Sequence, residues 1–319
     1  MMRPRAPRYP LFLLVLAVGA LFAGAGRDAP WPSALEGPAN RLTVEERARG
    51  WVLLFDGATF AGWRGLGRDG VPEKHWVIED GAIKKVPGGD VPLQADGQPI
   101  EGGDLMTVET FRDFELVFEW KIGPGGNSGV KYNVSEEMSI ANPPRSAALG
   151  FEYQILDDER HPDAKNGPNR TAAALYDLVA PEGKRLEPVG EFNRARIVFA
   201  GGHGEHWLNG VKVLFYDLGA PRMNELLARS KYKDIAGFAD KRDGHICLQD
   251  HTDAAWFRNI KIRRLKHSGD TRLNSPTARA GSDNAQSIEL SRVSPGLSIE
   301  RIFQGREFAP ERFGPARWM

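Results

Sequence analysis

The sequence predicts an all-β fold, a β-sandwich or jelly roll, from three observations. Short stretches of alternating apolar and polar residues recur between residues 51 and 265. Gly, Pro, Asn and Asp separate these stretches, and Asp80-Gly81 and Asn209-Gly210 have the composition of tight hairpin turns. Long helical periodicity is absent. Many short strands with glycine-rich corners favour a sandwich, in which one sheet often curves so that its outer face lines a groove.

The composition excludes several classes of partner. The chain has 319 residues, enough for one large β domain with appendages. Lys and Arg total 42 and Asp and Glu total 42, so there is no basic surface for nucleic acid. No P-loop, nucleophile elbow or cysteine-based zinc motif is present, and we expect no nucleotide cofactor.

Residues 1–26 have the pattern of an export signal. Arg3, Arg5 and Arg8 precede the apolar run "LFLLVLAVGALFAG", and small residues follow it. The run is shorter than the roughly 20 residues of a spanning helix, so no stable membrane anchor is expected after cleavage. Cys247 is the only cysteine, which leaves no internal disulfide and no lipidation site near the signal. We predict a periplasmic or secreted protein.

The remaining elements follow in chain order. Residues 27–42 form an irregular, Pro-rich lead-in, and "LTVEERARG" predicts one short N-terminal helix, with Thr43 and Glu46 as a capping box and Gly50 as its stop. "MNELLARSKYKD" has the pattern of a second short helix. The predicted strands lie in "WVLLF", "HWVIEDGAIKKV", "DFELVFEWKI", "GNSGVKYNV", "GFEYQIL", "RARIVFAGGHGEHWLNGVKVLFYDL", "GHICLQD" and "AWFRNIKIRRL". We assign residues 43–267 to one jelly-roll domain and 268–319 to a flexible linker and C-terminal extension of unknown role.

Four polar clusters lie on or just after predicted strands. In "GFEYQILDDERHPD", alternation places Glu152 and Gln154 opposite the apolar residues, with further acids and His161 beyond. The other clusters contain Lys131 in "NSGVKYNV", His206 in "GEHWLNG", and Gln249 with His251 and the nearby Arg258. Each has an ordinary structural explanation, such as a solvated strand face, a turn or the rim of a sheet. Together in one sandwich they predict a polar site.

An ordinary retaining glucanase is disfavoured. That chemistry needs two carboxylates about 5–5.5 Å apart. On the face of Glu152 the strand continues with Gln154 and Leu156, and Asp157 points to the other face.

The assembled motifs resemble the 3-keto-disaccharide hydrolase family. They are "GWVLLFDGATFAGWRG", "GDLMTVETFRDFELVFEWKIGPGGNSGVKYNV", "GFEYQILDDERHPDA", "ALYDL", "VGEFNRARIVFAGGHGEHWLNGVKV" and "CLQDHTDAAWFRNIKI", in the expected order from about residue 43 to 265. Departures are Phe192 where a tryptophan often stands, and one additional residue before the last strand. The resemblance implies a jelly roll of the concanavalin A-like lectin/glucanase type and an enzyme that cleaves 3-keto-glycosides.

The implied chemistry is elimination. A ketone at C3 acidifies the hydrogen on C2, so a base can remove it and the C1 substituent leaves; hydration then completes a net hydrolysis. Such a site needs a base, a positive group at the enolate oxygen and an acid for the leaving oxygen. On this reading Glu152 is base or metal ligand, Lys131 or a bound cation holds the enolate, and His206 or His251 protonates the leaving group.

The resemblance leaves three questions open: whether a metal ion takes part, which residues bind the substrate, and whether the protein catalyses a reaction at all. Glu152, His161 and Asp163 form a mixed oxygen and nitrogen set suited to a divalent metal ion acting as Lewis acid. Candidate substrate-binding residues, including aromatic stacking faces, are Gln154, Tyr132, Trp207, Gln249 and Arg258, and Trp120 fits a stacking face or the core equally well. The rival function is a non-catalytic, lectin-like carbohydrate-binding module with the same groove and no chemistry.

Overall fold

The computed structural model of the protein describes residues 37–89, 92, 103–142 and 147–266. The predicted signal, most of the lead-in and the predicted C-terminal extension lie outside these residues. Within them, no helix has the length and apolar composition needed to cross a membrane.

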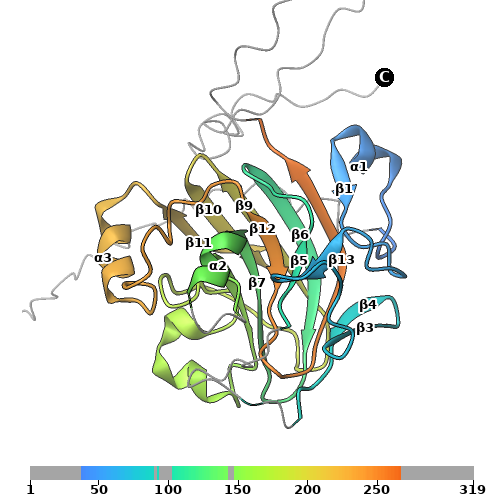
Figure 1. The fold of residues 1–319 in the computed structure, drawn as a ribbon, viewed down its shortest axis with the longest axis horizontal. Helices are drawn as coiled ribbons and strands as arrows, with labels where there is room; N and C mark the ends of the chain where they lie inside the picture. Colours follow the sequence, from blue (N-terminus) through green and yellow to red (C-terminus); the bar gives the residue numbers. More distant parts are fainter. Residues whose placement is uncertain (1–36, 90–91, 93–102, 143–146, 267–319) are drawn as a thin grey trace, which may run out of the picture. The chain divides into compact units, whose positions relative to one another are not determined.

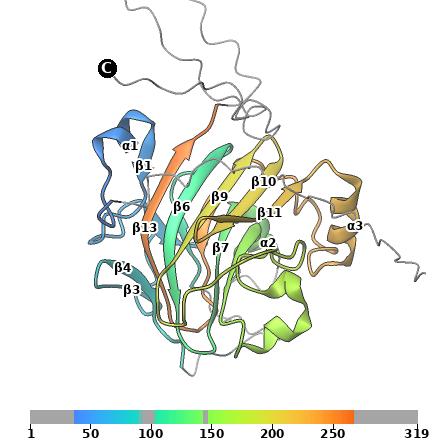
Figure 2. The ribbon, with the colours of Figure 1, turned by 180° about the vertical axis from the view of Figure 1, so that it is seen from behind.

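Two antiparallel sheets form the described part of the chain, and Figures 1 and 2 show them from opposite sides. Among the described residues, the large sheet has eight strands in the order β11-β10-β9-β6-β13-β4-β3, with β1 also paired to β13. Its strands are β1 (Trp51–Leu53), β3 (Trp76–Glu79), β4 (Ala82–Lys85), β6 (Phe114–Ile122), β9 (Asn193–Ala200), β10 (His203–Leu208), β11 (Val211–Asp217) and β13 (Ala255–Arg264).

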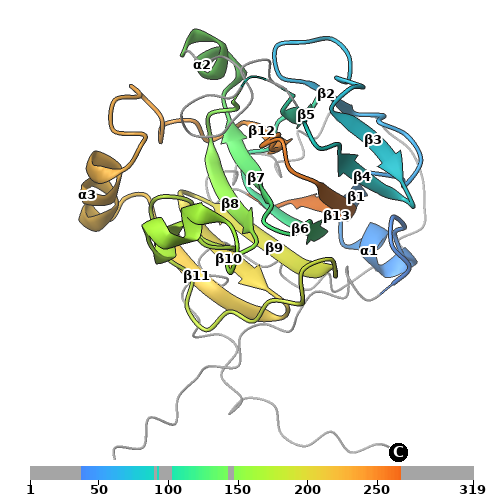
Figure 3. The ribbon, with the colours of Figure 1, turned by 90° about the horizontal axis from the view of Figure 1, so that it is seen from below.

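The small sheet has five strands within the described ranges, in the order β2-β5-β12-β7-β8. Its strands are β2 (Trp63–Gly65), β5 (Leu105–Thr107), β7 (Asn127–Val134), β8 (Phe151–Leu156) and β12 (His245–Leu248). Figure 3 shows the two sheets as separate layers, with β7 and β8 facing β9 and β10. The all-β prediction is confirmed. The short strands β2 and β5 lack a counterpart in the sequence pattern.

The core lies between the two sheets and consists of the alternate, inward-facing residues of each strand. Phe114, Leu116, Phe118 and Trp120 of β6 are all buried in it, as their spacing predicts. On the small sheet, the odd-numbered residues of β8 fill the same layer. Glu152 and Gln154 alternate with these residues and therefore face away from the core, whereas Leu156 at the end of the strand still packs in it.

The local turn and cap predictions are also confirmed. Asp80 and Asn209 have φ values of 50° and 46°, and the glycine after each has φ 72° and 88°, the left-handed pair of a type I′ hairpin turn. Helix α1 (Val44–Ala48) begins with the predicted capping box at Thr43. Helix α3 (Pro221–Arg229) occupies the second predicted helical segment, and α2 (Glu136–Ala141), which follows β7, was not expected.

Gly204 on β10 provides a test of the packing between the sheets. A Cβ at this position would overlap the ring of Tyr216, whose hydroxyl lies 2.7 Å from the hydroxyl of Tyr132 in the core. We expect Gly204→Ala to lower the free energy of unfolding by about 2–3 kcal/mol, because overpacking displaces the ring and this hydrogen bond. Chemical denaturation measures the effect. Gly70→Ala is the matched control, since a Cβ there meets no atom within 4 Å. Equal stability of the two variants would contradict the packing described.

Candidate active site

The outer face of β8 is a buried wall. Glu152 and Gln154 point away from the core, as predicted, but both are almost completely inaccessible to solvent. The segment after β8 folds back along this strand, so that the backbone N–H of Tyr176 donates to the carbonyl of Glu152 at 3.0 Å and that of Gln154 donates to Ala174 at 3.1 Å. This face therefore lines a site and is not an open, wet surface.

Gly129 forms the floor of that site. It pairs with Gln154 across β7 and β8, and on its other side its carbonyl accepts a hydrogen bond of 2.9 Å from the backbone of Gln249. A Cβ on Gly129 would lie 2.5 Å from Oε1 of Glu152. Because glycine has no side chain, the Glu152 carboxylate can lie directly over Gly129.

A pocket of about 210 Å³ opens above this floor. Its lining residues are Asn127, Glu152, Gln154, Arg170, Tyr176, Lys231, Gln249 and His251. The sequence predicted four of them, Glu152, Gln154, Gln249 and His251, from two separate segments. The structure brings these four together.

The surroundings of Glu152 shift its carboxyl toward the neutral form. Burial raises its pKa above the usual value, the charges of Lys131 and Lys231 oppose this rise, and Asp104 and Asp163 reinforce it. A buried carboxyl with a raised pKa beside a cavity is a typical general base.

Segments that the sequence analysis did not assign to the site supply more of the pocket lining. Arg170 forms ion pairs with Asp163 at 3.1 Å and Asp177 at 2.9 Å, and the hydroxyl of Tyr176 donates to Asp163 at 2.7 Å. The ammonium group of Lys231 lies 4.4 Å from the ring centroid of Tyr176. Two cations therefore border the pocket that contains Glu152.

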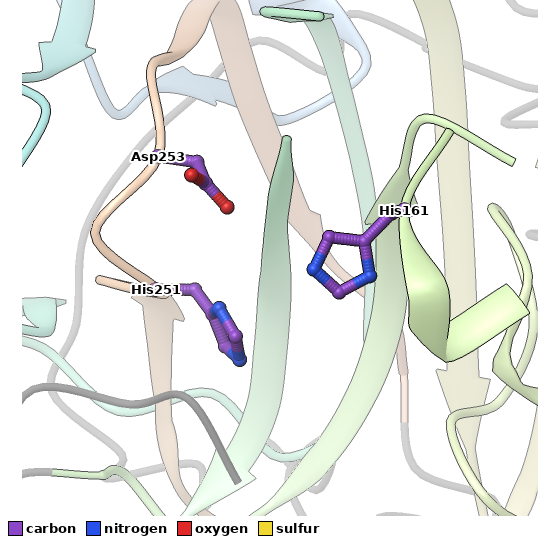
Figure 4. A group of neighbouring side chains, drawn as sticks. All are labelled: His161, His251 and Asp253. Carbon is purple, nitrogen blue, oxygen red and sulfur yellow. The ribbon is translucent and has the colours of Figure 1, made fainter. Parts of the chain in front are cut away.

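Three further side chains converge beside the pocket. His161, from the loop after β8, and His251 and Asp253, from the β12–β13 loop, point toward one another in Figure 4. Each offers one ligand atom, and these atoms all lie within 4.8 Å of one another. Asn127 connects this group to the pocket, because its backbone N–H donates to Asp253 at 2.9 Å and its side-chain nitrogen lies 3.4 Å from Nε2 of His251. Two imidazoles and a carboxylate suit a divalent transition metal.

The predicted metal set is therefore corrected in two of its three members. His161 belongs to the converging group, but Glu152 lies over Gly129 and not in this group. Asp163 accepts hydrogen bonds from Tyr176, Arg170 and Asn166, which occupy both of its oxygens. Burial alone would raise the pKa of Asp163, but these hydrogen bonds lower it.

His206 and Tyr132 lie in the core and not in the pocket. Nε2 of His206 is 2.9 Å from the hydroxyl of Tyr132, and Nδ1 is 3.0 Å from the carbonyl of Ala173. Burial lowers the pKa of His206 to about 3. The expectation that His206 faces the site is wrong, because β10 belongs to the large sheet and presents this residue to the core. Trp120 is likewise a core residue.

Trp207 and Arg258 lie on the outer face of the large sheet. The Trp207 indole donates to Glu205 at 2.8 Å and lies under the guanidinium of Arg196. Arg258 donates to Glu119 at 2.7 Å and stacks on the ring of Phe192 at 3.8 Å. Phe192 is the residue that stands where the family often has a tryptophan. Neither residue is among those that line the pocket, so the predicted contacts with substrate are not supported for them.

Lys131 shares the outer face of the small sheet with Glu152 but lies behind the pocket. The two residues are register partners, and the Lys131 ammonium is ion-paired with Asp104 at 3.1 Å with almost no exposure to solvent. Burial by itself would lower the pKa of Lys131, but the negative charges of Asp104 and Glu152 raise it by more, so the net shift is upward. Lys131 is placed to hold Glu152 and not to contact a ligand.

A larger cavity of about 640 Å³ lies at one end of the sandwich, next to Trp120, Pro124 and residues 186–189. Two of the five acids that line it are already bound, Asp157 to the backbone of Gly125 and Asp158 to Lys184. Among the described residues that line it there is no imidazole or lysine. The smaller pocket is therefore the better candidate for chemistry.

Some missed residues left a trace in the sequence and others did not. Asn127 has the same parity on β7 as Lys131, so alternation could have added it, and Asp253 lies only two residues after the predicted His251. Arg170, Tyr176 and Lys231 come from irregular segments, where sequence spacing does not determine the direction of a side chain.

Comparison with known proteins agrees with this geometry. Residues 50–263 match the family model of the 3-keto-alpha-glucoside-1,2-lyase-like domain. The chain belongs to this family. A 3-keto-disaccharide hydrolase from Bacteroides thetaiotaomicron is 37% identical over 292 residues, covering 81% of this chain and 98% of that protein. A crystal structure of a Parabacteroides distasonis protein assigned to the glycosyl hydrolases has a TM-score of 0.62 and 32% identity, covering 72% of this chain and 100% of that chain.

These matches confirm the predicted family, the predicted jelly-roll class and the expectation of a hydrolase or lyase. Both relatives are covered almost completely by this chain. The comparisons therefore concern the whole sandwich and not one segment of it.

The raised pKa of Glu152 has a consequence for stability that can be measured. When a carboxyl has a higher pKa folded than unfolded, it contributes stability below the unfolded pKa, and this is lost as pH rises through the folded pKa. We expect Glu152→Gln to be at least as stable as the parent protein at pH 7, with the advantage disappearing near pH 4. Denaturation from pH 4 to 8 measures this, with the exposed Glu137→Gln as control. A variant that loses stability specifically at pH 7 would contradict the assignment.

Proposed function

We propose that the protein cleaves 3-keto-glycosides by removing the proton on C2 and eliminating the substituent on C1. Family membership supports the substrate class. The observation that supports the mechanism is the buried Glu152 carboxyl, which lies over the side-chain-free floor at Gly129.

The reaction balances without a glycosyl nucleophile. The C2–H bond breaks as its proton passes to the carboxylate of Glu152, and its electrons delocalise onto the C3 oxygen as an enolate. When the C1–O bond breaks, these electrons form the C1–C2 double bond of an enone, and the departing oxygen takes a proton from the now neutral Glu152. Addition of water across the double bond, hydroxyl to C1 and proton to C2, gives net hydrolysis.

Glu152 suits both proton transfers because its surroundings disfavour a permanent charge. Burial raises its pKa, and a base whose pKa lies nearer to the working pH both accepts and returns a proton readily. Lys131, held by Asp104, keeps a compensating positive charge behind the carboxylate. Without that charge the ionised base would be strongly disfavoured at this depth.

The positive groups at the pocket are placed to offset the enolate. Arg170 is ion-paired with Asp163 and Asp177, and the ammonium of Lys231, which also lines the pocket, lies over the ring of Tyr176. We assign stabilisation of the enolate oxygen to Lys231. A preorganised cation near developing negative charge in a pocket shielded from water lowers the barrier most effectively.

The residues His161, His251 and Asp253 fit a divalent metal ion. Their donor atoms lie within 4.8 Å of one another, and all three side chains are partly buried. A bound ion would act as Lewis acid and polarise the C3 carbonyl. Asn127 ties Asp253 to β7, which keeps the group beside the pocket.

We also propose that the enzyme works in the periplasm or outside the cell. The charged leader and apolar run of residues 1–26 support export, and an absence of disulfides is compatible with it because the sandwich has a large core of its own.

The first test follows turnover by mass. We expect the purified protein to convert a 3-keto-glucoside, to leave the unoxidised parent glucoside intact, and to place one deuterium on C2 of the released sugar in D₂O. Glu152→Gln removes the base and should lower kcat/KM by about 10³-fold. Gly129→Ala displaces the same carboxylate and should lower kcat/KM by at least about tenfold with the fold retained.

Glu137→Gln, on the surface of α2, is the control and should retain full activity. Binding of the unoxidised glucoside without conversion of the ketone would support the lectin-like alternative. Activity retained in Glu152→Gln would remove this residue as the base.

The second test concerns the metal ion alone. We expect the metal-free protein to bind Mn²⁺ or Zn²⁺ by calorimetry, and Asp253→Asn or His161→Gln to weaken binding by about 10- to 100-fold, the cost typical of disturbing a ligand set. His203→Gln, at the start of β10 in the large sheet, is the control and should bind like the parent protein. If the parent protein binds neither ion, the metal assignment is wrong and Lys231 stabilises the enolate without a metal ion.

A further inference from the structure

The pocket contains two buried amide oxygens without a partner. Oε1 of Gln249 and Oδ1 of Asn127 accept no hydrogen bond in the structure, although both residues are more than 95% buried. A buried acceptor that has lost its water is costly unless a ligand supplies a donor. Both residues line the pocket with Glu152.

We propose that Asn127 and Gln249 read the hydroxyl groups of the 3-keto sugar, each accepting a hydrogen bond from one hydroxyl. This inference rests on the proposed function and assigns a specificity-determining role that the mechanism does not require. The substrate class selected is a 3-keto pyranose that presents free hydroxyl donors at C4 and C6.

Gln249 is held for this role by its backbone. Its N–H donates to Gly129 at 2.9 Å and its carbonyl accepts from the hydroxyl of Ser128 at 2.8 Å. The segment after β12 is thereby attached to β7, with the Gln249 side chain on the pocket side. The backbone contacts fix its position while the amide oxygen is left for a ligand.

Asn127, the first residue of β7, is held in the same way. Its backbone N–H donates to Asp253 at 2.9 Å, and its side-chain nitrogen lies 3.4 Å from Nε2 of His251. These contacts use the nitrogen atoms of the residue. The oxygen Oδ1 is the side-chain atom that they leave unpartnered.

Gln154 shows what an occupied amide looks like in the same pocket. Its Oε1 accepts from the backbone of Ile155 at 3.1 Å, and its Nε2 donates to the carbonyl of Arg170 at 3.4 Å. Gln154 therefore supports the wall. The two unpartnered oxygens stand out because the third amide in the same pocket is hydrogen-bonded at both ends.

An acceptor on the protein requires a donor on the sugar, which defines the experiment. Substituting fluorine for a hydroxyl removes the donor with little change in size. We expect the parent protein to process the 4-deoxy-4-fluoro or the 6-deoxy-6-fluoro analogue of a 3-keto-glucoside with kcat/KM about 10- to 100-fold below that of the hydroxyl substrate.

The variants Gln249→Met and Asn127→Leu identify which residue reads which hydroxyl. Each should lower kcat/KM for the hydroxyl substrate and reduce the preference over one fluoro analogue by more than about threefold relative to the parent protein. The electronic effect of fluorine cancels when the preference of the variant is divided by that of the parent. Gln154→Met is the matched control, because its amide faces the protein; it should retain the parental preference, and circular dichroism checks that each variant folds.

The outcomes separate this inference from the proposed function. If the hydroxyl substrate turns over but both fluoro analogues are processed within threefold of it, or if the preference persists in both Gln249→Met and Asn127→Leu, the inference is overturned. If the parent protein leaves the hydroxyl substrate unchanged, the proposed function itself fails.

Discussion

One buried carboxylate holds the candidate site together. Asp104, fully buried just before β5, accepts hydrogen bonds from the backbone of Asp250 at 2.7 Å and of Ala148 at 2.8 Å, and pairs with Lys131 at 3.1 Å. Of these three partners, Asp250 follows β12, Ala148 precedes β8 and Lys131 lies within β7. A charge at this depth persists only when every partner is in place. The relative placement of the three strands that line the pocket therefore depends on Asp104.

A second buried ion pair extends this arrangement toward the β12–β13 loop, which carries His251 and Asp253. Asp250 is ion-paired with Lys85 at 3.0 Å, Nδ1 of His75 lies 2.8 Å from its carboxylate, and the carboxylate also accepts from the backbone of Thr252. Thr252 has a φ of 68°, a left-handed conformation that is unusual for a β-branched residue. The paired carboxylate stabilises this turn, which places His251 and Asp253 on the same side of the loop.

The two faces of the small sheet divide its residues between stability and chemistry. Tyr132 and Lys131 are neighbours on β7, yet Tyr132 fills the core beside His206 and Lys131 lies beside Glu152 on the outer face. The same rule explains why His206 stays neutral at working pH while His251 lines the pocket. Burial within a close-packed core removes a histidine from proton transfer, whatever its intrinsic chemistry.

The sequence by itself determined the sandwich, the family and the orientation of β8, because hairpin turns, capping residues and two-residue alternation are local properties. Asp80-Gly81, Thr43 with Glu46, and Glu152 opposite Tyr153 all follow from neighbours along the chain. Alternation assigns a side chain to a face, but it cannot say whether that face meets the other sheet, solvent or a covering loop. Only the tertiary structure decided that His206 and Arg258 lie away from the pocket and that Lys231 and Asn127 border it, since pairing between distant strands and loops sets those surroundings.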